Sequence, residues 1–537
     1  MSSSVSGNSR ATEILVDPYL LREIFENFNC GSWSDKRSDE GMKSNAQLLH
    51  IALVCKAFTG PALDVLWHTI DSFILLCYTL SSLQRQSGQW VLTSRGLTSK
   101  DVTRFKSYAK RVRVVVTNIS SGSPLDGLLA DSMDFRRSKL SKVTLKTIFT
   151  RLREKVPAFF PNVLQVIATN ILEPAFYPIL LPALATPSLR QFYLMCALPA
   201  PPWRQALIRT SARCLPSMKG LKLLDISSED GDELYPCLRE MHSLETLKLG
   251  TLKNMPSLEL LGNLRSLTRL EIWRTGPYKL KEPSSSGVTA PSLWFPSLEE
   301  LIGWGGTLDI AMLLGAIRSK ALRKMYIVVA PPAPNEDMIK LLDKAMSKWG
   351  DSLVDLGIKT ITRAYMPNEF QKFRTIPFSQ LDSILPSLRS LQKVQLDLQP
   401  MSNVNFSAFA AALPNAQAIK LVDFNVAKFE DLRTFSKSCP HLRELTVPVD
   451  CKEVCSTARE PDAEASSCSL VSLFVGTSTY SLEPVKESLR SIFPDIREIS
   501  AFKDESPHAG LGTEELFEAT SAEMTLGKWK PDNSILV

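Results

Sequence analysis

The residue types that most often carry out acid–base or metal chemistry are sparse in this 537-residue chain. None of its five histidines, His50, His68, His242, His441 and His508, has a carboxylate or cysteine nearby at the spacing of a catalytic or zinc site. We expect His50 and His68 to be packing or surface residues of helices, while His242 and His441 stand just before expected strands. The sequence therefore predicts no histidine-based catalytic centre.

Three cysteines, Cys451, Cys455 and Cys468, are the best candidates for metal ligands. Zinc usually takes four thiolate or imidazole ligands in two closely spaced pairs, and the sequence offers no second pair. The glycine-rich stretch that begins at Gly303 lacks the Lys-Ser/Thr of a phosphate-binding loop, and neither a Gly-x-Ser-x-Gly motif nor a kinase signature set occurs. We expect no catalytic site, no metal and no cofactor; an enzyme built on a repeat domain is the alternative.

The overall composition is that of a globular protein with interspersed charges. Hydrophobic residues make up 44% and charged residues 22%, and the net charge of +6 comes from 62 basic and 56 acidic residues. Nucleic-acid-binding proteins usually cluster their basic residues, so we expect no nucleic-acid partner. The ten cysteines are scattered, the first ten residues lack the apolar core of a secretory signal, and apolar runs are too short to span a membrane. The simplest interpretation is a cytoplasmic or nuclear protein without a membrane partner.

Three short apolar segments near the N-terminus predict a small helical module. Asp17 and Pro18 are a favoured start for the first helix. Its apolar side chains share one stripe: Leu20, Leu21, Ile24 and Phe25. After a polar loop over 29–45, the apolar run 47–58 predicts a second helix, and 59–61 (Thr-Gly-Pro) is expected to end it and start a third. A module this small needs a partner or a neighbouring domain to cover it.

The order of these segments resembles the F-box motif, in which a Pro-led helix is followed by Leu-Val-Cys-Lys-x-Phe and then by Leu-Trp. The resemblance covers residues 13–75 and implies binding to an Skp-type adaptor, which connects to a cullin-RING ligase and so to ubiquitin transfer. The residues that match the motif, and that by resemblance bind the adaptor, are Pro18, Leu20, Leu21, Ile24, Phe25, Leu53, Val54, Cys55, Phe58, Leu66 and Trp67. The alternative is that the three segments are core helices of a larger α-helical domain.

A short phrase recurs over residues 156–503. A Pro or polar residue precedes Leu-x-x-Leu-x-Leu or a close relative thirteen times, as after Pro187 and His242, at intervals of roughly 24–35 residues. The Leu-x-x-Leu part of the phrase brings the chain round a turn. The Leu-x-Leu alternation that follows makes a short strand with one buried face. Intervening stretches such as 335–348 and 406–413 have the apolar spacing of a returning helix.

One strand and one helix cannot bury their apolar faces alone, so neighbouring repeats must stack. We therefore predict an α/β chain: a three-helix F-box followed by an irregular leucine-rich-repeat solenoid, with parallel strands on the concave side and helices on the convex side. The combination resembles F-box proteins of the fungal type. The expected order is a disordered N-terminus (1–12), the F-box module (13–75), a connector and solenoid cap (76–155), the solenoid (156–503) and a mostly disordered tail (504–537).

Variable strand positions on the concave face are the candidates for binding a protein substrate, because exposed aromatic residues and arginines are typical interface anchors. The candidates are Lys248, Arg269, Glu271, Trp273, Trp304 and Tyr326. The two tryptophans have an alternative role in filling gaps between irregular repeats. The resemblance implies a substrate-recognition adaptor of a Skp–cullin–F-box ubiquitin ligase. The alternative is a non-catalytic interaction scaffold with a vestigial F-box.

Overall fold

The computed structural model describes much of the chain in two compact units. The described residues are 17–28, 39–70, 73–86, 89–94, 96–118, 139–140, 142–169, 177–195, 201–226, 234–252, 261–275, 294–330, 335–360, 376–397, 401–422, 426–449, 468–477 and 489–502. The first unit comprises 1–252 and 256–267, and the second comprises 253–255 and 268–537. The expected disordered ends, 1–12 and 504–537, lie outside the described residues. In the part of the chain that is described, no helix combines the length and apolarity needed to cross a membrane.

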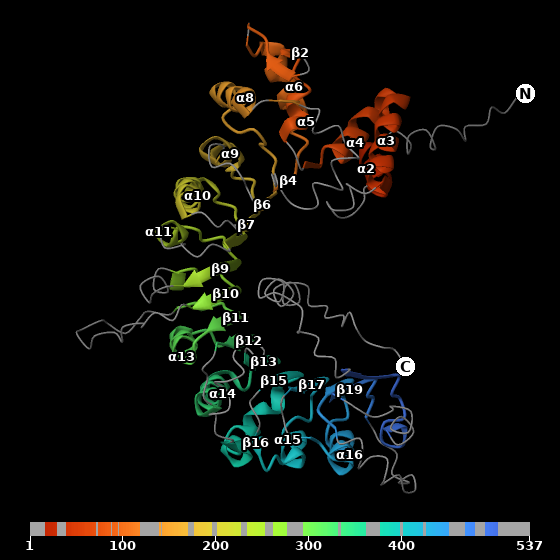
Figure 1. The fold of residues 1–537 in the computed structure, drawn as a ribbon, viewed down its shortest axis with the longest axis vertical. Coiled ribbons are helices and arrows are strands. Elements are labelled where there is room, and N and C mark those ends of the chain that lie inside the picture. Colours follow the sequence, from red (N-terminus) through yellow and green to blue (C-terminus); the bar gives the residue numbers. More distant parts are fainter. Residues whose placement is uncertain are drawn as a thin grey trace, which may run out of the picture. The chain divides into compact units, whose positions relative to one another are not determined.

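The first unit is built on six parallel strands (Figure 1). In sheet order they are β1 (Thr69–Ile70), β4 (Val114–Asn118), β6 (Gln165–Thr169), β7 (Gln191–Met195), β8 (Leu223–Ile226) and β9 (Thr246–Leu252). Along one side of the strands run α8 (Lys142–Lys155), α9 (Tyr177–Leu184), α10 (Pro201–Cys214) and α11 (Tyr235–Leu238). Before these helices come α5 (Phe73–Cys77), α6 (Ser99–Ala109) and a small sheet of β2 (Leu83–Gln86), β3 (Gln89–Leu92) and β5 (Lys139–Leu140).

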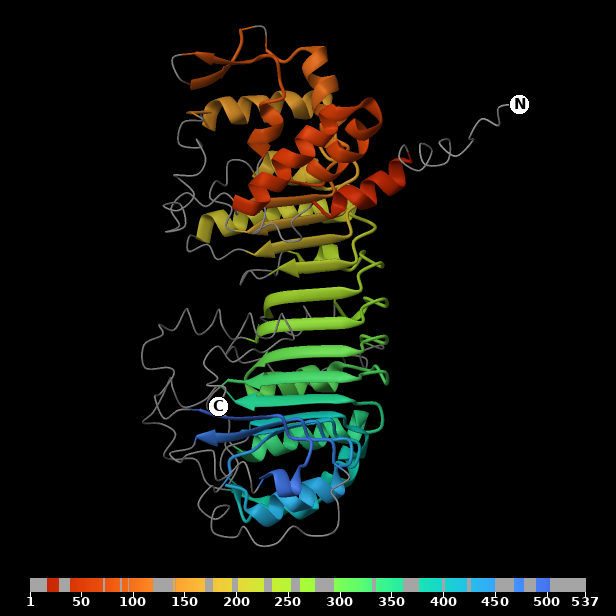
Figure 2. The same cartoon turned by 90° about the vertical axis from the view of Figure 1, so that its right-hand side faces the viewer.

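The second unit repeats the arrangement with nine parallel strands, which run side by side in Figure 2. They are β10 (Arg269–Thr275), β11 (Glu300–Gly305), β12 (Lys324–Val329), β13 (Asp355–Thr360), β15 (Lys393–Asp397), β17 (Ala418–Val422), β18 (Glu444–Thr446), β19 (Ser472–Thr477) and β20 (Glu498–Phe502). The returning elements are α13 (Thr307–Ala316), α14 (Asn335–Trp349), α15 (Phe406–Ala411), α16 (Phe429–Ser438) and the short pair β14 (Ile376–Pro377) and β16 (Met401–Ser402). The helices predicted over 335–348 and 406–413 are therefore present as α14 and α15.

All thirteen recurring phrases lead into a strand, which confirms the predicted fold class of parallel strands with returning helices. In one repeat Leu244, Leu247 and Leu249 are buried, with at most 2% of each exposed, because Leu-x-x-Leu-x-Leu places all three on the helix side of the sheet. The phrase at Pro386 needs correction. Residues Leu385–Ser390 form a 3₁₀ helix in which Leu388 is buried, and the Leu-x-x-Val-x-Leu pattern that enters β15 begins at Leu391.

Short polar side chains connect the turns of successive repeats. Each lies just before the first apolar residue of its phrase and donates a hydrogen bond of 2.8–2.9 Å to a carbonyl of the preceding repeat. These donors are Asn162, Ser188, Ser243, Ser352 and Asn415. Regular leucine-rich repeats use a ladder of asparagines, and here both serines and asparagines donate hydrogen bonds between turns. The hydrogen bonds satisfy carbonyls that the sheet leaves unpaired at the turn.

The N-terminal module has three helices, with boundaries that differ from the prediction. They are α2 (Pro18–Glu26), α3 (Asp39–Val54) and α4 (Lys56–Leu66). The second helix begins within the expected loop and ends earlier, since Cys55 has extended backbone angles. The third helix continues through the expected Thr-Gly-Pro break. Thr59 stabilises the junction of the two helices at Cys55, because its hydroxyl donates to the carbonyls of Ala52 (2.7 Å) and Cys55 (3.1 Å).

The parallel sheet begins earlier in the chain than the repeated phrase does. Its first strand, β1, directly follows the module and pairs with β4, within the segment 76–155 that we predicted to be a connector and cap. Both strands lack the leucine phrase, which explains why the sequence pattern starts only at the third strand, β6.

Asp101, at the start of α6, ties that segment together. Its buried carboxylate accepts hydrogen bonds from the amides and hydroxyls of Ser81 (2.6 and 2.7 Å) and Thr98 (2.9 and 2.6 Å). The amide and hydroxyl of Ser82 donate to it as well. Burial by itself raises the pKa of Asp101, but the hydrogen bonds from Ser82, Thr98 and Ser81 outweigh it and hold this pKa far below its ordinary value.

Asp101→Asn should lower the free energy of unfolding by about 2 kcal/mol at pH 7, because the amide replaces a charged acceptor. The folded-state pKa lies below the unfolded value of about 3.9, so the stabilisation is complete at neutral pH and declines as pH falls below about 4. Urea unfolding at several pH values measures both effects. The control Asp351→Asn, at an exposed carboxylate, should change stability by less than about 0.5 kcal/mol. A wild-type–variant difference that is independent of pH contradicts this role.

Candidate functional site

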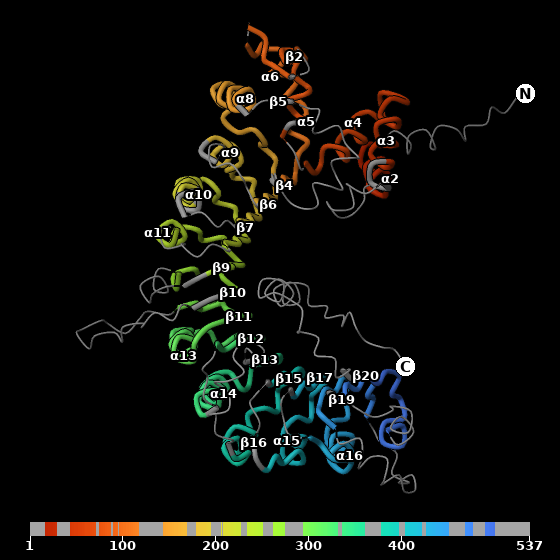
Figure 3. The backbone as a smooth tube through the Cα atoms, viewed as in Figure 1, coloured from red at the N-terminus to blue at the C-terminus, as the bar shows by residue number. Residues whose placement is uncertain are grey.

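The three helices of the N-terminal module lie together (Figure 3), and they enclose a small core of their own. Leu21 and Phe25 of α2 pack with Leu48 of α3 and Val65 of α4, and all four are buried. The ring of Phe58 meets that of Phe25 edge-on, with 5.6 Å between centroids. This core uses one edge of the apolar stripe on each helix, so the other edge points away from it.

Apolar side chains on that other edge are exposed. Leu20 and Ile24, four residues apart on α2, keep 39% and 49% of their surface exposed. At the end of α3, Leu53 and Val54 keep 75% and 70%. Isolated exposed apolar residues are common, but four on one small module make its surface a candidate for an interaction site.

Ten of the eleven residues that match the F-box pattern thus fall into two groups. Leu21 and Phe25 lie in the core, with Phe58 and Leu66 packed against it, so these four hold the module together and do not present a surface to a partner. The exposed group is Pro18, Leu20, Ile24, Leu53, Val54 and Cys55. Trp67 is half-buried, and its ring packs at 4.9 Å from the ring of Tyr108. Tyr19 and Leu49 are also exposed, and continuing the helical stripes by one position would have found them.

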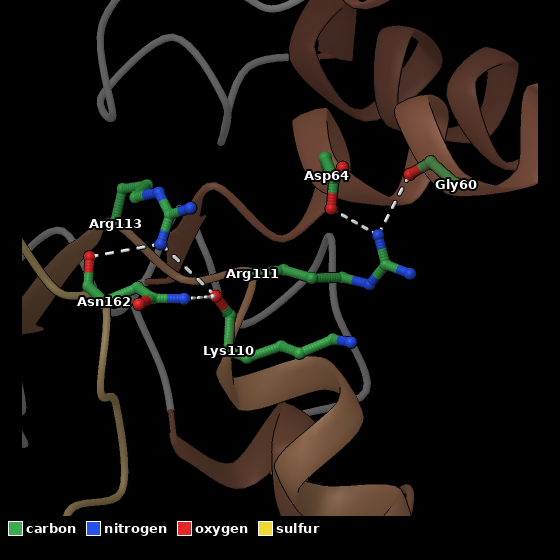
Figure 4. Close-up of polar contacts among 6 residues, drawn as sticks. All are labelled: Gly60, Asp64, Lys110, Arg111, Arg113 and Asn162. Carbon is green, nitrogen blue, oxygen red and sulfur yellow. Dashed lines mark hydrogen bonds and ion pairs between the residues drawn. The ribbon is translucent and has the colours of Figure 1, made fainter. Parts of the chain in front are cut away.

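Arg111, between α6 and β4, attaches the module to the first strands (Figure 4). Its Nη1 donates to the carbonyl oxygen of Gly60 at 3.0 Å and forms an ion pair with Asp64, both on α4. A second set of hydrogen bonds connects this turn to the next repeat. There Arg113 donates to the carbonyls of Lys110 and Asn162 at 3.3 and 3.2 Å. The module is therefore joined to the strands by a charge-assisted contact as well as by the chain.

Arg111→Ala should loosen the module, because the Gly60 carbonyl and the Asp64 carboxylate lose their shared donor. The Asp64 side chain is 45% exposed, so we expect a local loss of about 1 kcal/mol. Hydrogen exchange of the α4 amides should accelerate about fivefold. Arg113→Ala is the matched control, since it contacts no residue of α4, and it should leave exchange there unchanged. Equal exchange in α4 for both variants contradicts the attachment.

The sheet face opposite the buried leucines carries polar side chains at the variable strand positions. In the first unit Tyr193, Asp225 and Lys248 occupy one register row on β7, β8 and β9. The Lys248 Nζ lies 4.0 Å from Asp225 Oδ2, and both residues are largely buried. Burial, and then the Asp225 charge, raise the pKa of Tyr193. Lys248, a predicted substrate contact, thus interacts mainly with a neighbouring strand of its own sheet.

In the second unit, β10 and β11 carry an ionic group of one arginine and two glutamates. Arg269 reaches Glu271 through Nη2 (3.4 Å) and Glu300 through Nη1 (3.2 Å). The Glu271 side chain is only 1% exposed, while that of Arg269 is 31% exposed. Of these predicted contacts, Arg269 is therefore the accessible one, and its charge is balanced locally.

Tyr326 lies across the neighbouring strand. Its hydroxyl donates to the Asp355 carboxylate, and its ring covers Gly357, its register partner on β13. Burial raises the pKa of Asp355, against the opposing effects of the Tyr326 hydrogen bond and of Lys393, Lys324 and Lys420. Burial also raises the pKa of Tyr326, helped by Asp355. Reading the sequence repeat by repeat missed Asp355, because its partners come from other repeats.

Gly357→Ala should displace Tyr326, because a Cβ there would lie 2.4 Å from Cδ1 of that ring. We expect a loss of about 1–3 kcal/mol in the free energy of unfolding, measured by urea denaturation. In the control Gly60→Ala, the new Cβ meets nothing within 4 Å and sits in a helix. It should raise stability by about 0.5–1 kcal/mol. If Gly357→Ala leaves the free energy of unfolding unchanged, the Tyr326 ring does not require a residue without a Cβ beneath it.

The other candidates have structural surroundings or lie outside the described residues. Trp273 and Trp304 are half-buried. Cys468 is buried, its Sγ donates to the Leu442 carbonyl at 3.5 Å, and burial raises its pKa to about 11; Cys451 and Cys455 lie outside the described residues. Among the residues described, no group of three or more His, Cys, Asp or Glu side chains is placed to hold a metal ion.

No protein-family model and no curated protein matches the chain. Similar solved structures include a leucine-rich-repeat protein of Leptospira interrogans, at 12% identity and a TM-score of 0.27, covering 66% of this chain and 91% of that one. An internalin of Listeria monocytogenes has 13% identity and a TM-score of 0.27 (77% and 86%). A chain of the yeast Rad7–Elc1 complex has 12% identity and a TM-score of 0.29 (67% and 94%). At these values the matches carry no information on what this chain binds.

Proposed function

We propose that the chain is the substrate receptor of a Skp–cullin–F-box-type ubiquitin ligase. In this proposal the α2–α4 module docks on an Skp-type adaptor, and the repeats hold a protein substrate. The chain carries out no chemical step itself. It raises the effective concentration of the substrate near the catalytic subunits, and positioning of this kind accelerates transfer without a catalytic residue in the receptor.

The observation that carries the proposal is the exposed apolar edge of the module. Leu20, Ile24, Leu53 and Val54 match the F-box-like pattern, and none is used in the module's core. Burying a leucine-sized side chain at an interface stabilises a complex by about 1.5–3 kcal/mol before the costs of association. Four such residues are a sufficient centre for a specific interface.

The second candidate is an interaction scaffold in which the module only caps the sheet. The contacts of Arg111 with α4 and of Trp67 with Tyr108 favour it, because they tie the module to the first strands as a cap would be tied. A cap, however, gives no reason for exposed leucines on the edge of the module that its core does not use. The two candidates therefore differ in whether those leucines bind anything.

Leu53→Asp combined with Val54→Asp tests the proposal. Both side chains are exposed, so the double variant should fold, whereas Phe58→Asp would disturb the core. Titration calorimetry of the full chain with a purified Skp-type adaptor should show binding by the wild type and at least about 100-fold weaker binding by the variant.

Val143→Asp combined with Leu308→Asp is the matched control, since these apolar residues are 75% and 77% exposed on α8 and α13. It adds the same charge and should leave adaptor affinity unchanged. Absence of adaptor binding by the wild-type chain would refute the receptor role and leave the scaffold. Equal binding by wild type and the Leu53/Val54 variant would show that the adaptor uses another surface.

A further inference from the structure

The small net charge of the whole chain conceals a basic stretch in the first unit. Residues 100–222 contain 20 Lys and Arg but only 6 Asp and Glu, although the net charge of the chain is only +6. The structure describes two of these carboxylates: Asp101 is buried among hydroxyl donors, and Glu154 lies 3.9 Å from Arg151. Neither is available to balance the other exposed cations of this stretch.

Part of this charge lies along one edge of the sheet, where each repeat turns into its strand. Four residues form a row there, each directly after the first buried apolar residue of its repeat: Arg113, Leu164, Arg190 and Lys222. The amide of each donates to the carbonyl of the one before, at 2.7–2.8 Å. Lys110 and Lys219 stand three positions earlier in the first and last of these repeats. We call these six residues the turn edge.

The cations of the turn edge are not balanced by carboxylates. Lys222 alone forms an ion pair, at 2.7 Å from Glu245 of the next repeat. Among the described residues, the exposed ammonium groups of Lys110 and Lys219 have no partner, and in Figure 4 no contact reaches that of Lys110. Two positive charges are thus wholly unpaired at the ends of the edge.

The two arginines add two further charges. Arg113 donates to the carbonyls of Lys110 and Asn162, and Arg190 donates to that of Gly220 at 2.8 Å. Carbonyl oxygens are neutral, so each guanidinium keeps its charge. Serine side chains donate between turns elsewhere in the same unit, so hydrogen bonding does not explain why this edge is charged.

The middle of the turn edge is apolar. Leu164 lies between Arg113 and Arg190 in the row and keeps 43% of its surface exposed. Pro161 and Pro187, three positions before Leu164 and Arg190, are exposed as well. Cations therefore stand at the two ends of the edge, with an exposed apolar side chain between them.

This spacing fits an extended peptide. Parallel strands lie about 4.8 Å apart, so the three steps from the first to the last repeat of the edge cover about 14 Å. In an extended chain, residues i, i+2 and i+4 point the same way and span about the same distance. Acidic side chains at the two outer positions would meet the cations, and an apolar side chain at the central one would meet Leu164. A phosphate backbone offers nothing apolar to that leucine.

We propose that the turn edge of the first unit binds an extended segment of a protein partner with the pattern acidic-x-apolar-x-acidic. Lys110 and Arg113 bind one carboxylate, and Arg190 and Lys219 bind the other. Leu164 packs against the apolar side chain. None of these residues belongs to the α2–α4 module, so the inference goes beyond the proposed function and does not depend on it.

Fluorescence anisotropy of a labelled peptide containing Glu-x-Leu-x-Glu, with the full chain, tests the inference. Wild-type protein should bind it and should not bind the same peptide with lysines in place of the glutamates. Lys110→Gln combined with Lys219→Gln should weaken binding at least about fivefold, because two exposed charge pairs are lost. Added salt should weaken binding by the wild type more than binding by this variant.

Lys100→Gln combined with Lys146→Gln is the matched control. Both lysines are exposed, on α6 and α8 of the same unit, and both lie outside the turn edge. The control removes the same charge and should leave the affinity for the peptide unchanged.

Leu164→Ser tests the apolar middle separately. Wild-type protein should prefer the leucine peptide about three- to tenfold over a peptide with serine at that position. The variant should bind the two peptides about equally, because the contact is then missing from the protein side. Circular dichroism of each variant verifies that the repeats remain folded.

The inference fails if wild-type protein does not bind the acidic peptide, or if the two lysine pairs cause equal losses. It fails too if wild-type protein does not distinguish the leucine peptide from the serine peptide, since charge alone would then determine binding. Tighter binding of a single-stranded oligonucleotide through Lys110 and Lys219 would make the edge a nucleic-acid site and overturn the inference. None of these measurements involves the adaptor, so their results are independent of the receptor proposal.

Discussion

The structure depends on one constraint: a single repeat cannot bury its own apolar face. Leu244, Leu247 and Leu249 are covered because the neighbouring repeats supply the same three positions and because each strand hydrogen-bonds to the next. Parallel pairing in register then fixes the opposite face as well, since alternation along a strand leaves no choice about which side chains point there. The leucines determine the fold, and the residues between them are left to determine what the fold binds.

The same constraint explains the polar contacts between turns. Stacked repeats bring carbonyl groups together at each turn, where the strands no longer pair them, and a side chain of the following repeat can donate to them. Ser188 and Asn415 supply donors from equivalent positions of distant repeats. The serine hydroxyl and the asparagine amide differ in reach, so a mixed ladder tolerates less uniform spacing than asparagine alone. That tolerance fits the irregular repeat lengths of this chain.

Much of the fold could be predicted from the sequence, because the N-terminal helix pattern and the leucine phrase are both local in sequence. The leucine phrase contains its own period, and all thirteen copies precede strands. The helix boundary at Cys55 could not be predicted, since it depends on where the Thr59 hydroxyl finds acceptors. The sequence also could not show that Leu21 is buried while Leu20, on the same apolar stripe of α2, is exposed. That difference depends on where the neighbouring helices lie. Asp355 was missed for the same reason: its environment is assembled from strands that are remote in sequence.

A receptor that works by proximity has a physical requirement beyond affinity at its two binding surfaces. A docking module on a freely rotating linker dilutes the effective concentration it creates, because the tethered partner samples a large volume. Arg111 limits this freedom in the first unit, since it spans from the turn before β4 to Gly60 and Asp64 on α4. The Trp67–Tyr108 contact adds a second attachment between neighbouring parts of the same segments. These contacts restrain the exposed leucines of α2 and α3 relative to the first strands, as the proposed receptor role would require.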